Sequence, residues 1–298
     1  MSVINTNVSA LYSQNAMKTN ARAMSTAMEQ LSTGTRVNSA KDDAAGLAIG
    51  QNMTSQIRGL QQAVRNVNDG INMMQTAEGA MVEQSNMLQR MRELAVQAMN
   101  GTYSDVQRGY LNNEFQALGL QIDRIATDTK WNDQSLLNGA LALTTSPQTI
   151  PLGDPTGAGH GTFTFQAGKD EGQVVSVDIE AMTTSSLGLP LSAYSPNTMG
   201  IGTLATASTT LSAIETALET INEQRANIGA AINRLAYAAD NLTNIASNAT
   251  QSRSTIMDTD YALATTQLAK TQIIQQAATA MLAQANQQPQ GVMALLKG

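Results

Sequence analysis

The side chains of this sequence that could perform chemistry are few and scattered. His160 is the only histidine and lies in the glycine-rich stretch GAGHGT, and the chain contains no cysteine. A zinc site of the ordinary kind, or a Ser-His-Asp or Cys-His catalytic group, requires several ligands or partners that converge on one point. We therefore interpret His160 as an exposed loop residue, and we expect no enzymatic activity, no metal and no cofactor.

Two further stretches have the composition of a ligand site but not its spacing. Lys41, Asp42 and Asp43 could contribute to a cation site, but no further carboxylates follow at calcium-loop spacing, so a capped and solvated turn is favoured. The glycines between positions 153 and 161 lack the Lys-Ser/Thr pair and the strand-to-helix context of a phosphate-binding loop.

Charge and composition disfavour further classes of function. The formal net charge is -6 and there is no run of basic residues, so nucleic acid is not expected as a partner. No window reaches the roughly 18 apolar residues of a membrane-spanning helix. The first residues, MSVINTNVSALYSQNAMK, also lack the basic and apolar regions of a Sec signal peptide. We therefore expect neither membrane insertion nor export by the Sec route.

Most of the chain outside its middle segment is predicted to form long helices with a seven-residue repeat. Apolar residues alternate steps of three and four from about 43 to 100, from 111 to 125, and from 211 to about 251. At 1.5 Å per residue the first and third stretches correspond to rods of roughly 85 Å and 60 Å, which must lie side by side to bury their stripes. Each stretch contains two columns of residues spaced seven apart. The clearest columns are Met74, Met81, Leu88 and Ala95 in the first stretch and Ile214, Ile221, Ile228, Leu235 and Leu242 in the third. The second column of each of these stretches is interrupted by polar residues, namely Glu78, Ser85 and Arg92 in the first and Arg225 in the third.

Polar residues and glycine separate the predicted helices. Gly34 interrupts the first helical pattern, and Asp42 or Asp43 could cap the helix that follows. Ser-x-x-Gln at 104–107 and Ser-x-x-Glu at 212–215 each predict a capping box at a helix start.

The middle of the chain is different in kind. The segment 139–205 contains five of the six prolines, so no long helix is expected across it. Inside it, the stretches TFTF and VSVDI alternate with period two on either side of a glycine-containing turn. This pattern predicts a β-hairpin at about 162–180.

The two ends of the chain are amphipathic but almost uncharged. From Tyr261 to Leu296 only Lys270 is ionisable near neutral pH, and the first 28 residues contain only Lys18, Arg22 and the amino terminus. Solvated helix faces normally carry Lys, Glu and Arg, so pairing the two ends leaves a surface that still needs partners. Identical chains are the simplest supply of such partners.

These features predict that the ends fold during assembly. Short isolated helices are marginal in water, so we expect residues 1–30 and 262–296 to be largely disordered in the monomer. The predicted assembly interface comprises Ile4, Val8, Leu11, Met24, Met28, Leu31, Leu268, Ile274, Met281, Leu282, Val292, Leu295 and Leu296.

Four stretches of the sequence resemble bacterial flagellin. They are VINTNVSAL (3–11), VNSAKDDAAGLAIG (37–50), LQRMRELAVQAMNGTYSD (88–105) and QQAATAMLAQANQQPQGVMALL (275–296). The resemblance implies a mainly α fold, a long antiparallel coiled-coil helical bundle with a small β-hairpin insert and with the termini paired in a helical coiled coil. It also implies that copies of the chain self-assemble into the helical filament of the bacterial flagellum, which acts as a propeller for motility.

The resemblance further implies two domains. Residues 1–42 and 256–298 would form an inner terminal-helix coiled-coil domain, and residues 43–255 a helical rod that includes the loop-rich segment. Larger flagellins insert outer domains in the middle, so this chain resembles a compact type with little or no outer variable domain.

Partners and location are also implied by the resemblance. Flagellins pass from the cytoplasm through the flagellar type III apparatus and end in the extracellular filament. A flagellar export chaperone, a filament cap and hook-junction proteins are therefore expected partners, in addition to other copies of this chain.

A receptor is a further expected partner. Taken alone, Arg90, Arg92 and Glu93 indicate a solvated helix face with ion pairs three and four residues apart. The resemblance instead implies a surface sensed by Toll-like receptor 5. The matching positions are Leu88, Gln89, Arg90, Arg92, Glu93, Leu94, Gln97 and Glu114, whereas Met91, Ala98 and Met99 between them depart from the commonest spelling of the family.

Two alternatives to a filament subunit remain open at this point. A hook-filament junction protein would share the terminal helices but would lack the full match to LQRMRELAVQ. A cytoplasmic coiled-coil signalling rod of a chemoreceptor would carry many more surface charges and no hairpin insert. An enzyme is the least supported class, because no polar residues converge.

Overall fold

The computed structural model of the chain is mainly helical and has a small amount of antiparallel sheet, as predicted. It describes residues 7–139, 161–189 and 200–296, with side chains placed as far as residue 287. Its contacts divide the chain into two compact units. The terminal unit comprises Met1–Arg58 with Ala246–Gly298, and the central unit comprises Gly59–Ile245.

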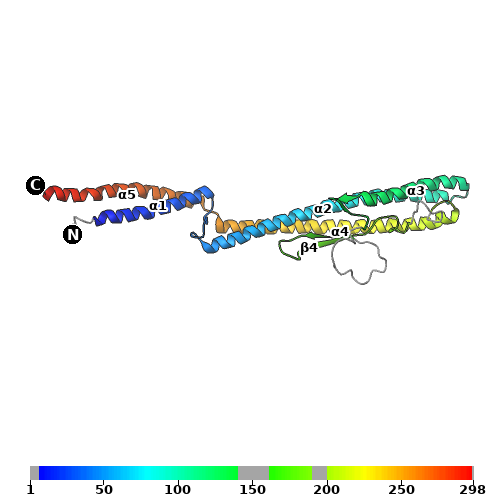
Figure 1. Cartoon of the computed structure of the whole chain (residues 1–298), viewed down its shortest axis with the longest axis horizontal. Coiled ribbons are helices and arrows are strands. Elements are labelled where there is room, and N and C mark those ends of the chain that lie inside the picture. The colour runs from blue at the N-terminus through cyan, green and yellow to red at the C-terminus, as the bar shows by residue number, and fades with distance from the viewer. Residues whose placement is uncertain (1–6, 140–160, 190–199, 297–298) are drawn as a thin grey trace. The chain divides into compact units, whose positions relative to one another are not determined.

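In the terminal unit, α1 (Val8–Thr33) and α5 (Tyr261–Leu296) lie side by side (Figure 1). The two helices run antiparallel. Asn7, at the start of α1, contacts Ala285, and Thr35, just after α1, forms a bridge with Asp258. Gly34 ends α1 in the left-handed conformation with φ 72°, a backbone that favours glycine, and so confirms the predicted interruption.

The chain that follows α1 caps the end of another long helix. α4 (Leu204–Met257) has no basic residue in its last turn. Arg36 takes that role, because its Nη2 donates to the carbonyl oxygen of Ile256 at 2.7 Å and its backbone N–H donates to that of Met257 at 2.6 Å. A cation at the end of a helix stabilises the exposed carbonyl groups there.

Asp43, and not Asp42, has the predicted capping role. Asp43 is the residue that caps α2 (Ala44–Ala98), since its Oδ1 accepts from the backbone N–H of Gly46 at 2.8 Å. Asp42 instead holds the preceding turn, where its Oδ2 accepts from the hydroxyl of Ser39 at 2.9 Å. That hydrogen bond is the largest cause of a lowered pKa for the Asp42 carboxyl.

The central unit contains α3 (Asp105–Asp128) together with most of α2 and α4 (Figure 1). The predicted seven-residue columns are confirmed, because their members on α2 and α4 are buried and α3 adds Phe115 and Ile122 to the same core. Two of the polar breaks pair with each other, since Arg225 lies 3.8 Å from Glu78, and a third, Arg92, lies 3.1 Å from Glu215 on α4.

The helix starts in this unit give one confirmation and one correction. Ser104 and Gln107 form the predicted capping box at the start of α3. The second predicted box, Ser212 with Glu215, is wrong because α4 begins at Leu204 and passes through both positions. Thr203 and Thr206 form the reciprocal contacts at the start of α4, with each backbone N–H donating to the other hydroxyl at 3.1 and 3.3 Å. The buried face of α4 already includes Ala207, which lies before Ser212. The helix therefore begins earlier than the Ser-x-x-Glu pattern indicates.

A hairpin follows α3 in sequence, as predicted. Strands β3 (Gly161–Gln166) and β4 (Val174–Ile179) pair antiparallel, with Phe163 opposite Val177, and both of these side chains face the core. A smaller hairpin of β1 (Lys130–Trp131) and β2 (Gln134–Ser135) was not predicted. Its turn residues, Asn132 and Asp133, both have positive φ, as a two-residue hairpin turn of type I′ requires.

Candidate functional site

The predicted assembly residues in the terminal unit fall into two groups. Met24, Leu31, Leu268 and Leu282 are half-buried between α1 and α5. These four side chains therefore belong to the contact between the two helices. Among the other described members of the set, Val8, Leu11, Met28 and Met281 are exposed, and the partly exposed Ile274 lines a groove beside this contact. Ile4 lies outside the described residues, and the side chains of Val292, Leu295 and Leu296 lie in the part of α5 whose side chains are not described.

Further apolar and aromatic side chains extend the exposed group. Tyr12 on α1 is 74% exposed, and Leu263 and Ile273 on α5 are 71% and 66% exposed. The predicted assembly interface did not include these three residues. They lie in the same chain ends of low charge, which is the signal that could have identified them. Exposed apolar residues on helices with few charged residues indicate surfaces that another protein covers.

The fully buried side chains in the contact between α1 and α5 are small or polar. Asn20 and Ala27 are the buried residues of α1, and Ala264 and Thr271 are the buried residues in the described part of α5. Because the fully buried side chains are small or polar and the larger Met and Leu side chains are only half-buried, we expect the pair to gain modest stabilisation from its own contact.

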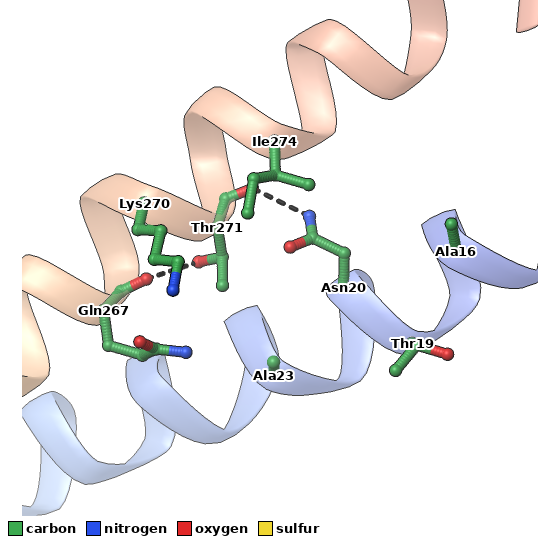
Figure 2. A pocket seen from close by; sticks show the side chains of 8 residues that line it. All are labelled: Ala16, Thr19, Asn20, Ala23, Gln267, Lys270, Thr271 and Ile274. Atoms are coloured by element: carbon green, nitrogen blue, oxygen red, sulfur yellow. Dashed lines mark hydrogen bonds between the residues drawn. The ribbon is translucent and has the colours of Figure 1, made fainter. Parts of the chain in front are cut away.

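Asn20 provides the main polar link across this contact. Its Nδ2 donates to the backbone oxygen of Thr271 at 2.8 Å and to Oε1 of Gln275 at 3.2 Å. Figure 2 shows Asn20 reaching from α1 to α5 beside an open groove. The groove is lined by Ala16, Thr19, Asn20, Ala23, Gln267, Lys270, Thr271 and Ile274.

In the central unit, Arg90, Glu93 and Glu114 of the expected receptor-recognition set form an exposed ionic cluster over part of α2 and α3. Arg90 lies 2.9 Å from a carboxylate oxygen of Glu93 and 2.9 Å from one of Glu114. Hydrogen bonds to Glu93 and then to Glu114 raise the pKa of the Arg90 guanidinium. Gln97 donates to the hydroxyl of Tyr103 at 3.0 Å, so the cluster is ordered by contacts within the unit.

Two members of the predicted recognition set do not belong to this surface. Leu88 and Leu94 are buried in the core of the central unit, with 0% and 1% of their surface exposed. Their side chains therefore support the surface and are not available to a partner. The members that remain exposed are Gln89, Arg90, Arg92, Glu93, Gln97 and Glu114.

Arg108 has a structural role that the sequence did not reveal. It is buried and reaches back from α3 to the end of α2, where Nε donates to the oxygen of Ala98 at 2.9 Å and Nη2 to that of Asn100 at 3.2 Å. α2 has no basic residue in its last turn, so Arg108 supplies the cation that its terminal carbonyl groups favour.

Within the described part of the chain, no three His, Cys, Asp or Glu side chains gather closely enough to hold a metal ion. The helices described here also include none with the length and apolar character that crossing a membrane requires.

Comparison with known proteins gives a consistent result over both ends of the chain. A family profile described as "Bacterial flagellin N-terminal helical region" matches residues 4–142, and one described as "Bacterial flagellin C-terminal helical region" matches residues 211–296. A flagellin of Halalkalibacterium halodurans is 40% identical over 99% of this chain and 100% of its own length. Flagellin A of Vibrio cholerae is 36% identical over 99% of both chains.

A solved structure shares the fold. The structure of a putative flagellar hook-associated protein from Vibrio parahaemolyticus covers 72% of this chain and 99% of its own, with a TM-score of 0.54 and 18% sequence identity. At that identity the likeness concerns the fold alone.

Proposed function

This chain belongs to the bacterial flagellin family and is a structural subunit of the flagellar filament, and from that premise we propose that the paired helices α1 and α5 form its main assembly surface. The filament is a polymer of such subunits and belongs to the extracellular flagellum. Relatives named as flagellins that match over nearly the whole chain favour this function over the hook-junction and signalling-rod alternatives.

The observation that carries the proposal is the exposed apolar surface of the α1–α5 pair. Leu11, Met28 and Met281 are each about half exposed or more, on helices with almost no charged residues. Burying the exposed part of such a side chain against a neighbour contributes roughly 1 kcal/mol each. A set of these contacts, repeated from copy to copy, favours the polymer over the separate chain once their sum exceeds the cost of association.

The geometry of such contacts decides the form of the assembly. Identical patches that face each other across a two-fold axis close into a dimer, whereas head-to-tail contacts between different patches generate a helical filament. In our proposal, residues 1–42 and 256–298 form the inner coiled-coil domain that makes these contacts, and residues 43–255 form the rod domain. The terminal unit of the structure, which contains both chain ends, supports this division.

Electron microscopy of the concentrated purified chain tests the proposal directly. We expect filaments from the intact chain and none after removal of the last 20 residues, which include the end of α5. Met281→Lys should reduce polymerisation strongly because it places a charge on the exposed apolar surface, and Met281→Leu is the matched control that should polymerise normally. Equal filament yield from the Met281→Lys chain would refute the assembly role of this surface.

We also propose the export partners that the family implies. Before secretion through the type III apparatus, a cytoplasmic flagellar chaperone would cover the apolar C-terminal segment, and a cap protein and hook-junction proteins would receive the subunit outside. The exposed apolar residues of α5 support a need for such cover. Co-purification of the chain with the chaperone, abolished by Met281→Lys, would support this step. Retention of the complex by that variant would count against α5 as the covered segment.

A second proposal concerns recognition by Toll-like receptor 5 through the exposed cluster around Arg90. Its ordered ion pairs with Glu93 and Glu114 give the surface a fixed charge pattern, which supports selective recognition. Arg90→Asp should greatly reduce receptor activation by the soluble chain. Arg65→Asp, at an exposed arginine elsewhere on α2, is the control and should have little effect. Unchanged activation by the Arg90 variant would contradict the proposal.

Flagellin is a structural protein family, and we propose no catalytic activity for this chain.

A further inference from the structure

We propose that Asn20 and Gln275 set the register in which α1 and α5 pair, and so specify which surface the chain ends present to neighbouring subunits. The inference rests on the proposed assembly role of this helix pair. It concerns a choice that precedes any contact between copies, namely which turn of α5 lies against which turn of α1.

The small side chains of the contact do not make that choice. At seven-residue spacing, Ser13, Asn20 and Ala27 of α1 face the partner helix and are half-buried or buried. The corresponding column of α5 is nearly uniform. It consists of Ala264, Thr271, Ala278 and Ala285. A slip of one heptad therefore replaces one small residue by another, so these two columns distinguish the registers weakly.

The second inward column of α5 removes this ambiguity. It comprises Leu268, Gln275 and Leu282, all half-buried, and only Gln275 has a side chain that can accept a hydrogen bond. In the observed register Asn20 donates to Oε1 of Gln275 at 3.2 Å. A slip of seven residues in either direction would place Asn20 against a leucine. The buried amide would then lose a partner, which disfavours the slipped pairing.

The bond from Asn20 to the backbone of Thr271 does not contribute to this choice in the same way. Every turn of α5 presents a backbone carbonyl, so a slipped pairing could replace that bond. The side-chain contact with Gln275 is specific to one register. A single buried asparagine is known to select register in coiled coils at some cost in stability.

Two other contacts are in the same register but lie at the ends of α1. Asn7 donates to the backbone oxygen of Ala285 at 2.9 Å, and Thr35 pairs with Asp258. The contact at Thr35 fixes the register only once that turn has closed. Before it closes, or where the ends of two different copies meet, the Asn20–Gln275 pair is the side-chain contact that distinguishes one heptad from the next.

Engineered disulfides can report the register, because the natural chain has no cysteine. Ser13→Cys with Ala278→Cys lies seven residues from the Asn20–Thr271 contact on both helices and reports the observed register. Ser13→Cys with Ala285→Cys reports a slip of one heptad. Each pair is oxidised in the full-length chain, both in solution and in filaments, and disulfides within a chain are separated from those between chains by gel mobility.

In the otherwise natural chain we expect the first pair to cross-link and the second to give little product. Gln275→Leu should raise the slipped product about tenfold, the factor that corresponds to loss of one buried hydrogen bond. Gln275→Leu with Leu282→Gln moves the acceptor by one heptad and should make the slipped product the major one. Gln275→Glu retains an acceptor and should keep the observed register.

Two results would overturn the inference. One is that Gln275→Leu and the double variant both retain only the observed cross-link, which would show that the turn at Thr35 sets the register alone. The other is that the natural chain already yields both products equally. Failure of the natural chain to form filaments would count against the proposed assembly role instead, since the cross-links in solution still report the register.

Discussion

The central and terminal units are built from similar long helices but bury very different side chains. Phe115, Met81 and Ile122 are fully buried in the core of the central unit. In the terminal pair, the buried residues of α1 are Asn20 and Ala27. Apolar burial contributes roughly 25 cal/mol per Å², so the central unit is stabilised by its own contacts to a far greater degree than the terminal pair.

This difference explains how one chain can be both a stable subunit and a polymer. The apolar residues that the terminal pair does not bury are exposed on α1 and α5, where a neighbouring copy can cover them. The structure describes the paired state of these helices. In dilute solution, we expect a separate chain to adopt that state only part of the time.

The largest expected effect is therefore a difference in amide hydrogen exchange between the units. In the dilute monomer, we expect α1 and α5 to exchange with an opening free energy close to zero, whereas core amides of α2 exchange only through opening that costs several kcal/mol. The corresponding rates should differ by at least about a thousandfold. After polymerisation, both helices should become protected.

Exchange monitored by mass spectrometry on monomer and filament would measure this directly. The central unit is the internal reference, because its protection should change little on assembly. Strong protection of residues 8–33 and 262–287 in the dilute monomer would remove the contrast between the units and with it the case for folding during assembly.

The next effect concerns the source of stability in the central unit. Phe115→Ala should lower the free energy of unfolding by about 3 to 5 kcal/mol, because it leaves a cavity among fully buried side chains. Tyr110→Ala on the same helix is the control, since that ring is 69% exposed, and it should cost less than about 0.5 kcal/mol. Urea denaturation of the monomer provides the measurement.

The same experiment sharpens the comparison if it includes the terminal unit. Leu11→Ala should leave the urea transition of the monomer unchanged but reduce polymerisation, because its side chain is half exposed until another copy covers it. A loss of monomer stability similar to that of Phe115→Ala would mean that the terminal pair is already well packed.

How far the sequence predicts these two regions depends on the kind of residue. The seven-residue columns predict the core of the central unit, including the burial of Leu88, because a large apolar residue in phase with Met74 and Met81 must face inward. The placement of Leu88 in the recognition set came from the resemblance instead, which does not separate supporting from exposed positions.

Polar residues are less predictable from the sequence because their role depends on a partner distant in the chain. Asn20 resembles its many exposed polar neighbours until the partner helix places Gln275 opposite it. Arg108 likewise gains its role from the end of α2. The turn at Asn132 and Asp133 has a recognisable local signal, since both residue types tolerate positive φ, but its strands are too short for an alternating pattern.

A smaller effect is expected where the central unit depends on a polar residue. Arg108→Met should lower the free energy of unfolding by about 1.5 to 3 kcal/mol, because the carbonyl oxygens of Ala98 and Asn100 lose a charged donor. Arg65→Met, at an exposed position on α2, is the control and should change stability by less than about 0.5 kcal/mol. Equal urea midpoints for the two variants would show that the buried cap is dispensable.

The smallest effect is expected in the terminal unit, at the exposed turn before α2. The hydroxyl of Ser39 donates to Asp42, as do the backbone N–H groups of Ser39 and Asn38, and these bonds lower the pKa of the carboxyl in the folded turn. A carboxyl group of lowered pKa stabilises the folded state above its unfolded-state pKa. That contribution is lost as the pH falls through the folded-state pKa.

We therefore expect the turn to loosen only below about pH 4, the ordinary range of an aspartic acid. Amide chemical shifts of Asn38 and Ser39, followed by NMR as the pH is lowered, should titrate with a midpoint below that of an unstructured aspartate. Asp42→Asn should abolish this titration, while the amide of Phe115 in the central unit should not respond to it. A midpoint at or above the ordinary value would mean that the turn does not hold the carboxylate. The end of α1 would then be connected to α2 by a looser segment than its hydrogen bonds indicate.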